Sequence, residues 1–520
     1  MKALRNIKEG LYIMKKLVTL FLALLMVIAV MPTSTAEETP MVITIARGGD
    51  TTTMDPIYAG DNVDIWVMNL VFEGLVRSTA DGKSIEPCLA TSWDISDDGL
   101  VYTFHLREDV KFSDGTPVTA EDWEYSLERS LELGAWNSLI SSIDDVKAVD
   151  EKTIDIVLKN PSGSLLASLA AFFCAVVPKD YYSSTDDDTL ASNPIGTGPF
   201  YLESWVPQES MCFKKNPNYW DAEHPFADEI DFLVVPDDNT RIMQLQAGQV
   251  DIATGINAQM KAMIAGQADI NVVDFESTHV EYISMNYTSE KLNNTRVRQA
   301  LNYATDRDAI IQAVYGGQGT RCTSIVWPAA PHYNPDLPTY NYDLEKAKEL
   351  LAEAGAENLE LNLIITAGSP SDLMMATILK SQWGKAGVTL NIQQLDSSAR
   401  REHRNNLTFE VLLNYFTSDI IDTSENLEMF CIKENYDCWH LGWNGERQEL
   451  AEQLIREAGA TNDEAVRLEK YQEAQLIFAE DALIIPVCCV PETVAMRSNV
   501  TGFIQNPLGT YMFNELTLTD

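Results

Sequence analysis

The chain has 520 residues, of which 22% are charged and 45% hydrophobic, and its formal net charge is −40 at pH 7. This length exceeds one compact core and predicts two or three domains, and the apolar content argues against disorder. The negative charge disfavours nucleic acid and anionic membrane surfaces as partners and favours a cationic or zwitterionic ligand, although it also simply keeps a secreted protein soluble.

The first 36 residues have the pattern of a secretory signal peptide. Basic residues precede a mostly apolar run of 15 residues, 17–31, and small residues at 34–36 permit cleavage after Ala36. The run is short for a membrane span of about 20 residues, so an uncleaved anchor is the weaker alternative. No cysteine follows the run closely. We therefore expect a periplasmic or secreted protein without lipid attachment or stable membrane insertion; without the leader's +4 charge, the −40 becomes −44.

Apolar periodicity predicts strands and helices in alternation over the first half of the chain. A helix that begins at residue 120 is expected to be capped by Thr119, and residues 186–188 are expected to form an exposed acidic loop. Residues 164–177 fit either a helix or a strand. The expected strands are 41–46, 102–106, a pair within 147–158, 229–236 and 281–286, and the other expected helices are 63–73 and 240–247.

A constrained loop is predicted in the middle of the chain. The segment 193–200 reads Asn-Pro-Ile-Gly-Thr-Gly-Pro-Phe and is followed by alternating residues up to Trp205. Its two prolines exclude a helix, and Gly196 and Gly198 are expected to use positive φ angles. A loop that feeds a strand in this way is a plausible place for the chain to pass between domains.

The second half of the chain alternates between helices and strands and therefore indicates a second α/β lobe. The helix expected over 295–311 contains a second turn capped by Thr305 or Asp306. The other expected helices are 344–355, 373–387, 446–459 and 462–480, and the expected strands are 359–366, 388–394, 410–416 and 483–490.

No catalytic or metal-binding motif is found in the sequence. It contains neither a nucleophile elbow nor a phosphate-binding loop, and its six histidines lack metal-ligand spacing. The aspartate pairs 97–98, 144–145 and 237–238 are interpreted as turn residues. Among eight cysteines, Cys431 and Cys438 could close a short loop, whereas Cys488 and Cys489 fit a buried strand. We therefore expect no enzyme, no cofactor and no metal site.

Several segments together resemble solute-binding protein family 5, the extracytoplasmic oligopeptide-, dipeptide- and nickel-binding receptors of ABC importers. The most specific likeness lies in residues 87–93, 102–115 and 118–126 taken together. The other matching segments are the central loop with the following Lys-Asn-Pro-Asn-Tyr-Trp at 215–220, and residues 54–75, 236–252 and 295–311.

The resemblance implies an α/β protein with the two-lobed periplasmic-binding-protein type II fold. Lobe I would be discontinuous (37–80, 195–285 and 491–520), residues 81–194 would form an extra small inserted domain, and 286–490 would form lobe II. It also implies a non-enzymatic, monomeric receptor that holds a peptide between the lobes and delivers it to the permease of an ABC transporter with cytoplasmic ATPases.

The resemblance also places a ligand site on both lobes. Asp419 would pair with the peptide's α-ammonium group, the alternative being a solvated loop carboxylate. Phe416 would be the aromatic residue at the strand end, with Tyr415 beside it, and the backbone from Asn414 onward would bind the peptide main chain. The remaining expected ligand contacts are Gly60, Asp61, Asn62 and the aromatic wall Trp136.

The chain departs from the family pattern at three places. Phe416 replaces the usual tryptophan, Thr423 replaces a proline, and the loop 367–370 lacks the arginine that dipeptide-type members use for the ligand carboxylate. An oligopeptide is therefore expected over a dipeptide. Arg400, Arg401 and Arg404 could supply a positive charge, but a solvated helix face is expected for them.

Other ligands and functions stay open at this point. A nickel chelate, an oligosaccharide or another small solute could bind to the same fold. A secreted acidic hydrolase or a chemosensory adaptor is the alternative from a different class.

Overall fold

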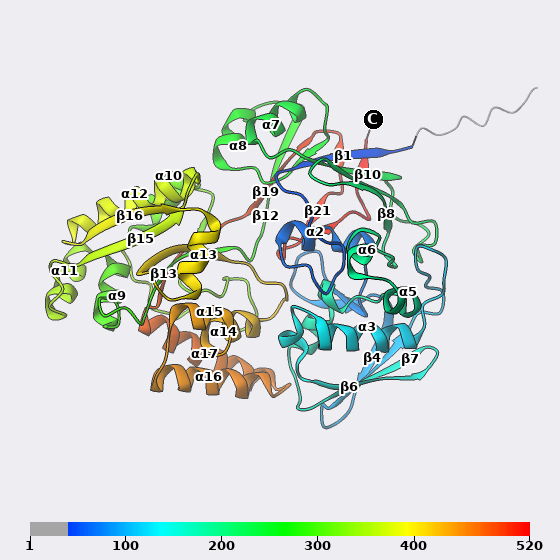
Figure 1. Cartoon of the computed structure of the whole chain (residues 1–520), viewed down its shortest axis with the longest axis horizontal. Coiled ribbons are helices and arrows are strands. Elements are labelled where there is room, and N and C mark those ends of the chain that lie inside the picture. The colour runs from blue at the N-terminus through cyan, green and yellow to red at the C-terminus, as the bar shows by residue number, and fades with distance from the viewer. Residues whose placement is uncertain (1–39, 520) are drawn as a thin grey trace, which may run out of the picture. The chain divides into compact units, whose positions relative to one another are not determined.

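The computed structural model of the chain describes residues 40–519, apart from the side chains of residues 397, 436 and 437 (Figure 1). The predicted signal peptide lies outside the described residues. Within the described range, no helix is both long enough and apolar enough to span a membrane. Two large sheets, each flanked by helices, organise this part of the chain, and we call the units built on them lobe I and lobe II.

The sheet of lobe I has seven strands in the order β12-β19-β11-β1-β10-β9-β8. Side chains alternate across β1, so that Ile43 and Ile45 pack with helix α2 while Ala46 packs with helices α7 and α8 on the other face. The elements are β1 (Val42–Arg47), α2 (Asn62–Val71), β8 (Phe200–Val206), β9 (Ser210–Lys215), β10 (Glu229–Val234), α7 (Asp238–Gln246), β11 (Ile252–Ala253), α8 (Ala258–Ile264), β12 (Ile270–Phe275) and β19 (Glu492–Arg497).

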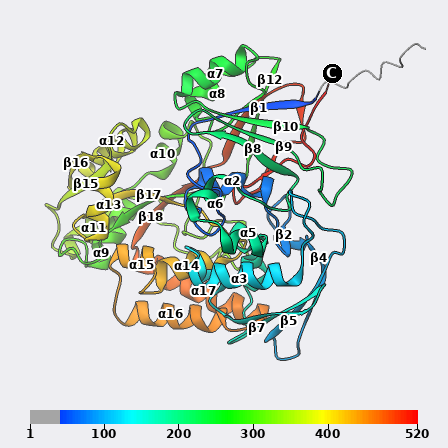
Figure 2. The ribbon, with the colours of Figure 1, turned by 45° about the vertical axis from the view of Figure 1, so that its right-hand side comes forward.

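The sheet of lobe II has six strands in the order β14-β18-β13-β17-β15-β16. Helices α9 to α12 pack on one face, and helices α14, α16 and α17 on the other (Figures 1 and 2). The strands are β13 (Val280–Met285), β14 (Thr320–Arg321), β15 (Glu360–Thr366), β16 (Thr389–Leu395), β17 (Val411–Phe416) and β18 (Ile484–Cys489). The helices are α9 (Thr295–Tyr303), α10 (Arg307–Val314), α11 (Leu344–Glu353), α12 (Pro370–Lys385), α13 (Ser397–Asn405), α14 (Thr423–Cys431), α15 (Tyr436–Leu441), α16 (Glu446–Gly459) and α17 (Glu464–Asp481).

The α/β alternation predicted for the second half is confirmed. The helical run expected over 295–311 is divided into α9 and α10, and Asp306 caps α10 by accepting a hydrogen bond from the backbone N–H of Ala309. The predicted lobe boundary falls after residue 285, whereas the strand pairing places β13 in the sheet of lobe II.

Two segments connect the sheets, residues 276–279 between β12 and β13 and residues 490–491 between β18 and β19. They are joined directly, because the N–H of Val490 donates to the carbonyl of His279 at 2.9 Å. We call these two segments the hinge.

Residues 81–194 build a four-stranded antiparallel sheet, β4-β5-β7-β6, against helix α3. The predicted cap is confirmed, since Thr119 forms a capping box with Asp122. The elements of this inserted segment, with the hairpin before it, are β2 (Val76–Ser78), β3 (Ile85–Pro87), β4 (Ala90–Ile95), β5 (Val101–Leu106), α3 (Ala120–Leu133), η1 (Asn137–Ile140), β6 (Ile143–Asp150), β7 (Thr153–Leu158), α4 (Leu165–Leu169), η2 (Phe172–Cys174), α5 (Lys179–Ser184) and α6 (Asp187–Ser192). The C-terminal strands are β20 (Val500–Thr501), β21 (Ile504–Gln505), β22 (Tyr511–Met512) and β23 (Thr517–Leu518).

Two local predictions in the inserted segment are wrong. The acidic residues expected as a loop begin helix α6, because the Asp186 carboxylate caps it by accepting from the N–H of Thr189. The pair Asp144 and Asp145 lies within strand β6 instead of a turn. In both places the acidic side chains stay near solvent while the backbone follows a regular element.

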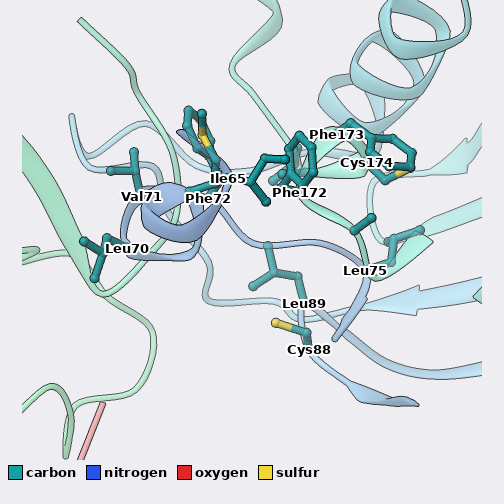
Figure 3. Packing of buried hydrophobic residues seen from close by; sticks show 14 of the residues in the cluster. Ile65, Leu70, Val71, Phe72, Leu75, Cys88, Leu89, Phe172, Phe173 and Cys174 are labelled. Atoms are coloured by element: carbon teal, nitrogen blue, oxygen red, sulfur yellow. The ribbon is translucent and has the colours of Figure 1, made fainter. Parts of the chain in front are cut away.

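Helix α2 connects lobe I to the inserted segment through a buried apolar cluster. Figure 3 shows Phe72, the residue directly after this helix, near Phe172 and Phe173, with Leu75 and Leu89 below them. The next residue, Glu73, accepts hydrogen bonds from the Tyr219 hydroxyl at 3.1 Å and the Trp220 indole at 3.0 Å. The segments 54–75 and 215–220, both part of the family resemblance, are thus in contact through these polar residues, which stabilise the fold.

Gly196 and Gly198 are needed for a close approach to helix α2, and the predicted positive φ angles are wrong. Neither residue has positive φ. The N–H of Gly198 donates to the Val71 carbonyl at 2.8 Å. A Cβ atom on Gly196 would lie 2.0 Å from that same carbonyl oxygen, which is far inside van der Waals contact.

We expect Gly196→Ala to destabilise the protein by at least about 3 kcal/mol, because the new methyl group displaces the backbone of helix α2. The matched control is Gly384→Ala in α12, where no heavy atom lies within 4 Å of the added Cβ and helix propensity predicts a gain of up to ~1 kcal/mol. Urea unfolding of both variants measures the effects. Equal stability of the two variants would contradict the close-approach explanation.

Candidate functional site

Asp419 follows strand β17 and lies beside a second carboxylate, Glu425 of helix α14. The N–H groups of Asp419 and Ile420 donate to Glu425 Oε2 at 2.9 and 3.1 Å. Burial raises the pKa of Asp419 to about 7, although a hydrogen bond with Glu425 acts in the opposite direction. Burial and the charge of Asp419 raise the pKa of Glu425 well above its usual range. Within residues 40–519, neither carboxylate forms an ion pair, so the site lacks a cation.

Asp422, three residues further along, has a structural role. Its two oxygens accept hydrogen bonds from the Arg467 guanidinium at 2.7 and 2.9 Å, and both side chains are buried. It also caps α14 through the N–H of Ser424. The sequence contains both aspartates in one turn, and the structure distinguishes the neutralised Asp422 from the un-neutralised Asp419.

The three predicted residues of strand β17 have different surroundings. Asn414 bonds the Ser284 hydroxyl at 2.7 Å, and Phe416 packs edge-to-face on Phe430 at 5.3 Å. Both side chains are therefore engaged within lobe II. Tyr415 is 58% exposed, with its ring 4.8 Å from the imidazole of His279. Of the three, Tyr415 has the side chain that a ligand could contact most readily.

Arg400 of helix α13 contacts the end of strand β17, so the solvated helix face expected for it is wrong. Its guanidinium donates to the Asn414 amide oxygen at 2.6 Å and to the carbonyl of Leu413. Desolvation and the positive charge of Arg404 lower the pKa of Arg400. The sequence did not predict a half-buried cation at this strand end, because helix periodicity alone assigns residues 397–405 to a polar surface.

The residues predicted on lobe I lie before helix α2. Gly60 and Asp61 are exposed, Asp61 occupies the N-cap position, and Asn62 begins the helix. Although the Tyr415 side chain is 58% exposed, partial desolvation raises the pKa of its hydroxyl, and the charges of Glu281 and Asp61 raise it further. Asp61 of lobe I therefore acts electrostatically on Tyr415 of lobe II.

Trp136 supports the same region from the inserted segment. Its indole donates to the Ala59 carbonyl at 2.8 Å, and its ring stacks on Phe173 at 6.3 Å. A buried pair, Arg129 with Asp55 at 2.5 Å, fixes the preceding turn. Trp136 thus holds the turn before Gly60 in place.

The hinge contains a histidine that the sequence interpretation missed. Nε2 of His279 lies 3.2 Å from Glu281, and Nδ1 lies 3.9 Å from Glu492. Burial lowers the pKa of His279, but the two carboxylates outweigh it and raise the pKa to about 9. No local signal reveals this cluster, since Glu492 belongs to the second hinge crossing.

Two cavities lie next to these elements. One of 310 Å³ lies between the inserted segment and lobe II, and Ile420 and Ser424, which flank the Asp419 turn, contribute to its wall. A larger one of 470 Å³ adjoins the hinge. None of the predicted site residues lines either cavity, but Ile420 on the wall of the smaller one directly follows Asp419 in the chain.

No disulfide joins the cysteines within residues 40–519, so the short loop that Cys431 and Cys438 could close has no disulfide. On the lobe I sheet, Cys212, Glu229 and Asp231 place their potential ligand atoms within 4.8 Å of one another.

Comparison with known proteins relates this geometry to one family. The model of the bacterial extracellular solute-binding proteins, family 5, matches residues 84–438. The chain is 32% identical to heme-binding protein A of Haemophilus influenzae, over 84% of this chain and 85% of that protein. It is 30% identical to the dipeptide-binding protein of Escherichia coli, over 86% and 89%. The periplasmic binding protein DppA of Helicobacter pylori, solved with the peptide STSA, superposes with a TM-score of 0.80 at 28% identity, covering 92% of this chain and 99% of that one.

Proposed function

Because the chain belongs to family 5 of the bacterial extracellular solute-binding proteins, we propose that it is the extracytoplasmic receptor of an ABC importer for peptides. It binds a peptide between the two lobes and delivers it to the membrane permease, which the cytoplasmic ATPases drive. It acts as a monomer, without catalysis, after removal of its signal peptide.

One observation carries this proposal, namely the adjacent carboxyl groups of Asp419 and Glu425, which have no cationic partner among residues 40–519. A peptide's α-ammonium group is costly to desolvate unless a carboxylate receives it. The half-buried Asp419 supplies that partner, and the exposed ring of Tyr415 lies at the end of the preceding strand. The backbone of residues 414–416 can add hydrogen bonds to the peptide main chain that do not depend on the peptide's sequence.

An oligopeptide is proposed over a dipeptide. The loop 367–370 before α12 carries Ala-Gly-Ser-Pro and offers no cation to a carboxylate that would lie one residue from the ammonium group. A longer peptide places its carboxylate elsewhere.

Haem is the second candidate ligand, because a relative at 32% identity is a heme-binding protein. Calorimetry with di-, tri- and tetrapeptides, an N-acetylated tripeptide and haem separates the two. We expect tri- or tetrapeptides to bind and N-acetylation to abolish binding, because it removes the ammonium charge. Binding of haem without any peptide would overturn the peptide proposal.

A further inference from the structure

The 310 Å³ cavity between the inserted segment and lobe II has the polar groups of an anion site. Six serines line it, together with Asn160 and two cationic side chains, Lys159 and Arg456. The serines are Ser138, Ser141, Ser142, Ser162, Ser164 and Ser424. Hydroxyl and amide donors beside a cation are the groups that receive a carboxylate in proteins.

The two cations differ in how far they are already neutralised. Arg456 is held by Glu452 at 2.7 Å and Glu434 at 3.4 Å. Lys159 donates to the Ser141 carbonyl at 2.9 Å, and it has no carboxylate partner among residues 40–519. Lys159 is therefore the cation of the two whose charge is not compensated by a carboxylate. The one carboxyl group that lines the cavity is Glu428, and burial raises its pKa to about 7, so that its protonated form can donate a hydrogen bond near and below pH 7.

The cavity is connected to the Asp419 turn through two residues of its wall. Ile420 directly follows Asp419, and Ser424 lies in the first turn of helix α14. The wall opposite belongs to the inserted segment, which contacts lobe II directly, since the Asn462 amide donates to the Tyr102 hydroxyl at 3.3 Å. An extended tripeptide spans roughly 10 Å, so a short peptide with its ammonium group at Asp419 would carry its carboxylate to a separate subsite.

We propose that the serine-lined cavity receives the carboxylate of the ligand, with Lys159 as its counter-ion. This inference rests on the proposed function and specifies its substrate class as a zwitterionic short peptide with a free C-terminus. Lys159 and the serines would bind the ligand's carboxylate, which the loop 367–370 cannot do because it has no cation.

The test compares a tripeptide with its C-terminal amide by calorimetry. Wild-type protein should prefer the free acid by about tenfold or more, the usual size of one charge-assisted interaction. Lys159→Met should reduce that preference to near one while the affinity for the amide stays the same. Lys147→Met is the matched control, because Lys147 pairs with Asp145 at 2.8 Å on the same inserted segment and does not line the cavity.

A third variant distinguishes failure of this inference from failure of the proposed function. Asp419→Asn should weaken the acid and the amide equally and keep their ratio. An unchanged ratio in Lys159→Met, or no preference in wild type, overturns the carboxylate site. If Lys159→Met loses the preference for the free acid while Asp419→Asn binds peptides with wild-type affinity, the carboxylate site in the cavity is supported and the role of Asp419 is overturned. Absence of binding to every peptide overturns both.

Discussion

Asp419→Asn should weaken peptide binding by about 100-fold or more at pH 8, since the ligand's desolvated ammonium group loses its carboxylate partner. The amide keeps the shape of the side chain, so the loss reports the charge. Asp97→Asn is the control, because it changes the net charge equally in an exposed turn. Calorimetry at constant ionic strength measures both, and an Asp419→Asn affinity equal to that of the control would remove Asp419 from the site.

The same residue should make binding depend on pH. The pKa of Asp419 without ligand is about 7, and the ammonium group needs the ionised carboxylate. Above pH 7 the affinity should be constant, and below it binding must release a proton, so the affinity should fall by up to about tenfold per pH unit. Titrations from pH 5 to 8 in buffers of different ionisation enthalpy count that proton. A flat profile in wild type would show that the carboxylate pair does not contact the ligand.

The second large effect concerns stability. Arg467→Met should destabilise lobe II by about 3–5 kcal/mol, because it leaves the buried Asp422 carboxylate without its partner. The double variant Arg467→Met/Asp422→Asn should recover part of the loss, as the isolated charge is then gone. Urea unfolding measures each step.

An exposed ion pair is the control for this result. Arg296 pairs with Glu353 at 3.2 Å with both side chains largely in solvent, so Arg296→Met should cost less than about 1 kcal/mol. If the double variant were less stable than Arg467→Met alone, the penalty would come from lost packing instead of the unpaired charge.

Periodicity and capping predicted most elements of this fold, as α12 and β17 illustrate, because both signals are local. These signals gave wrong predictions where a hydrogen-bond partner or a close neighbour determines the local structure. The Asp186 carboxylate caps a helix, α6, where a loop was expected, and the Arg400 guanidinium binds the end of β17 where a solvated position was expected. Gly196 is required because helix α2 lies too close for a Cβ atom, not because of a positive φ angle.

In the predicted site, too, local features could be predicted and long-range contacts could not. The sequence places Asp419 after a strand. Its contact with Glu425 and the ion pair of Asp422 with Arg467 depend on helices that pack against the turn. Lys159 could not be related to Asp419 at all, because the two come from different structural units.

Strand β19 lies between β11 and β12, although it follows all of lobe II in the chain. A polypeptide that is synthesised N-terminus first therefore exposes two unpaired strand edges in lobe I until the residues after 491 are available. Lobe II has all of its described strands by residue 489. Its assembly can precede that of the lobe that begins the described range, and a nascent chain arrested before β19 would be a target for chaperones and proteases.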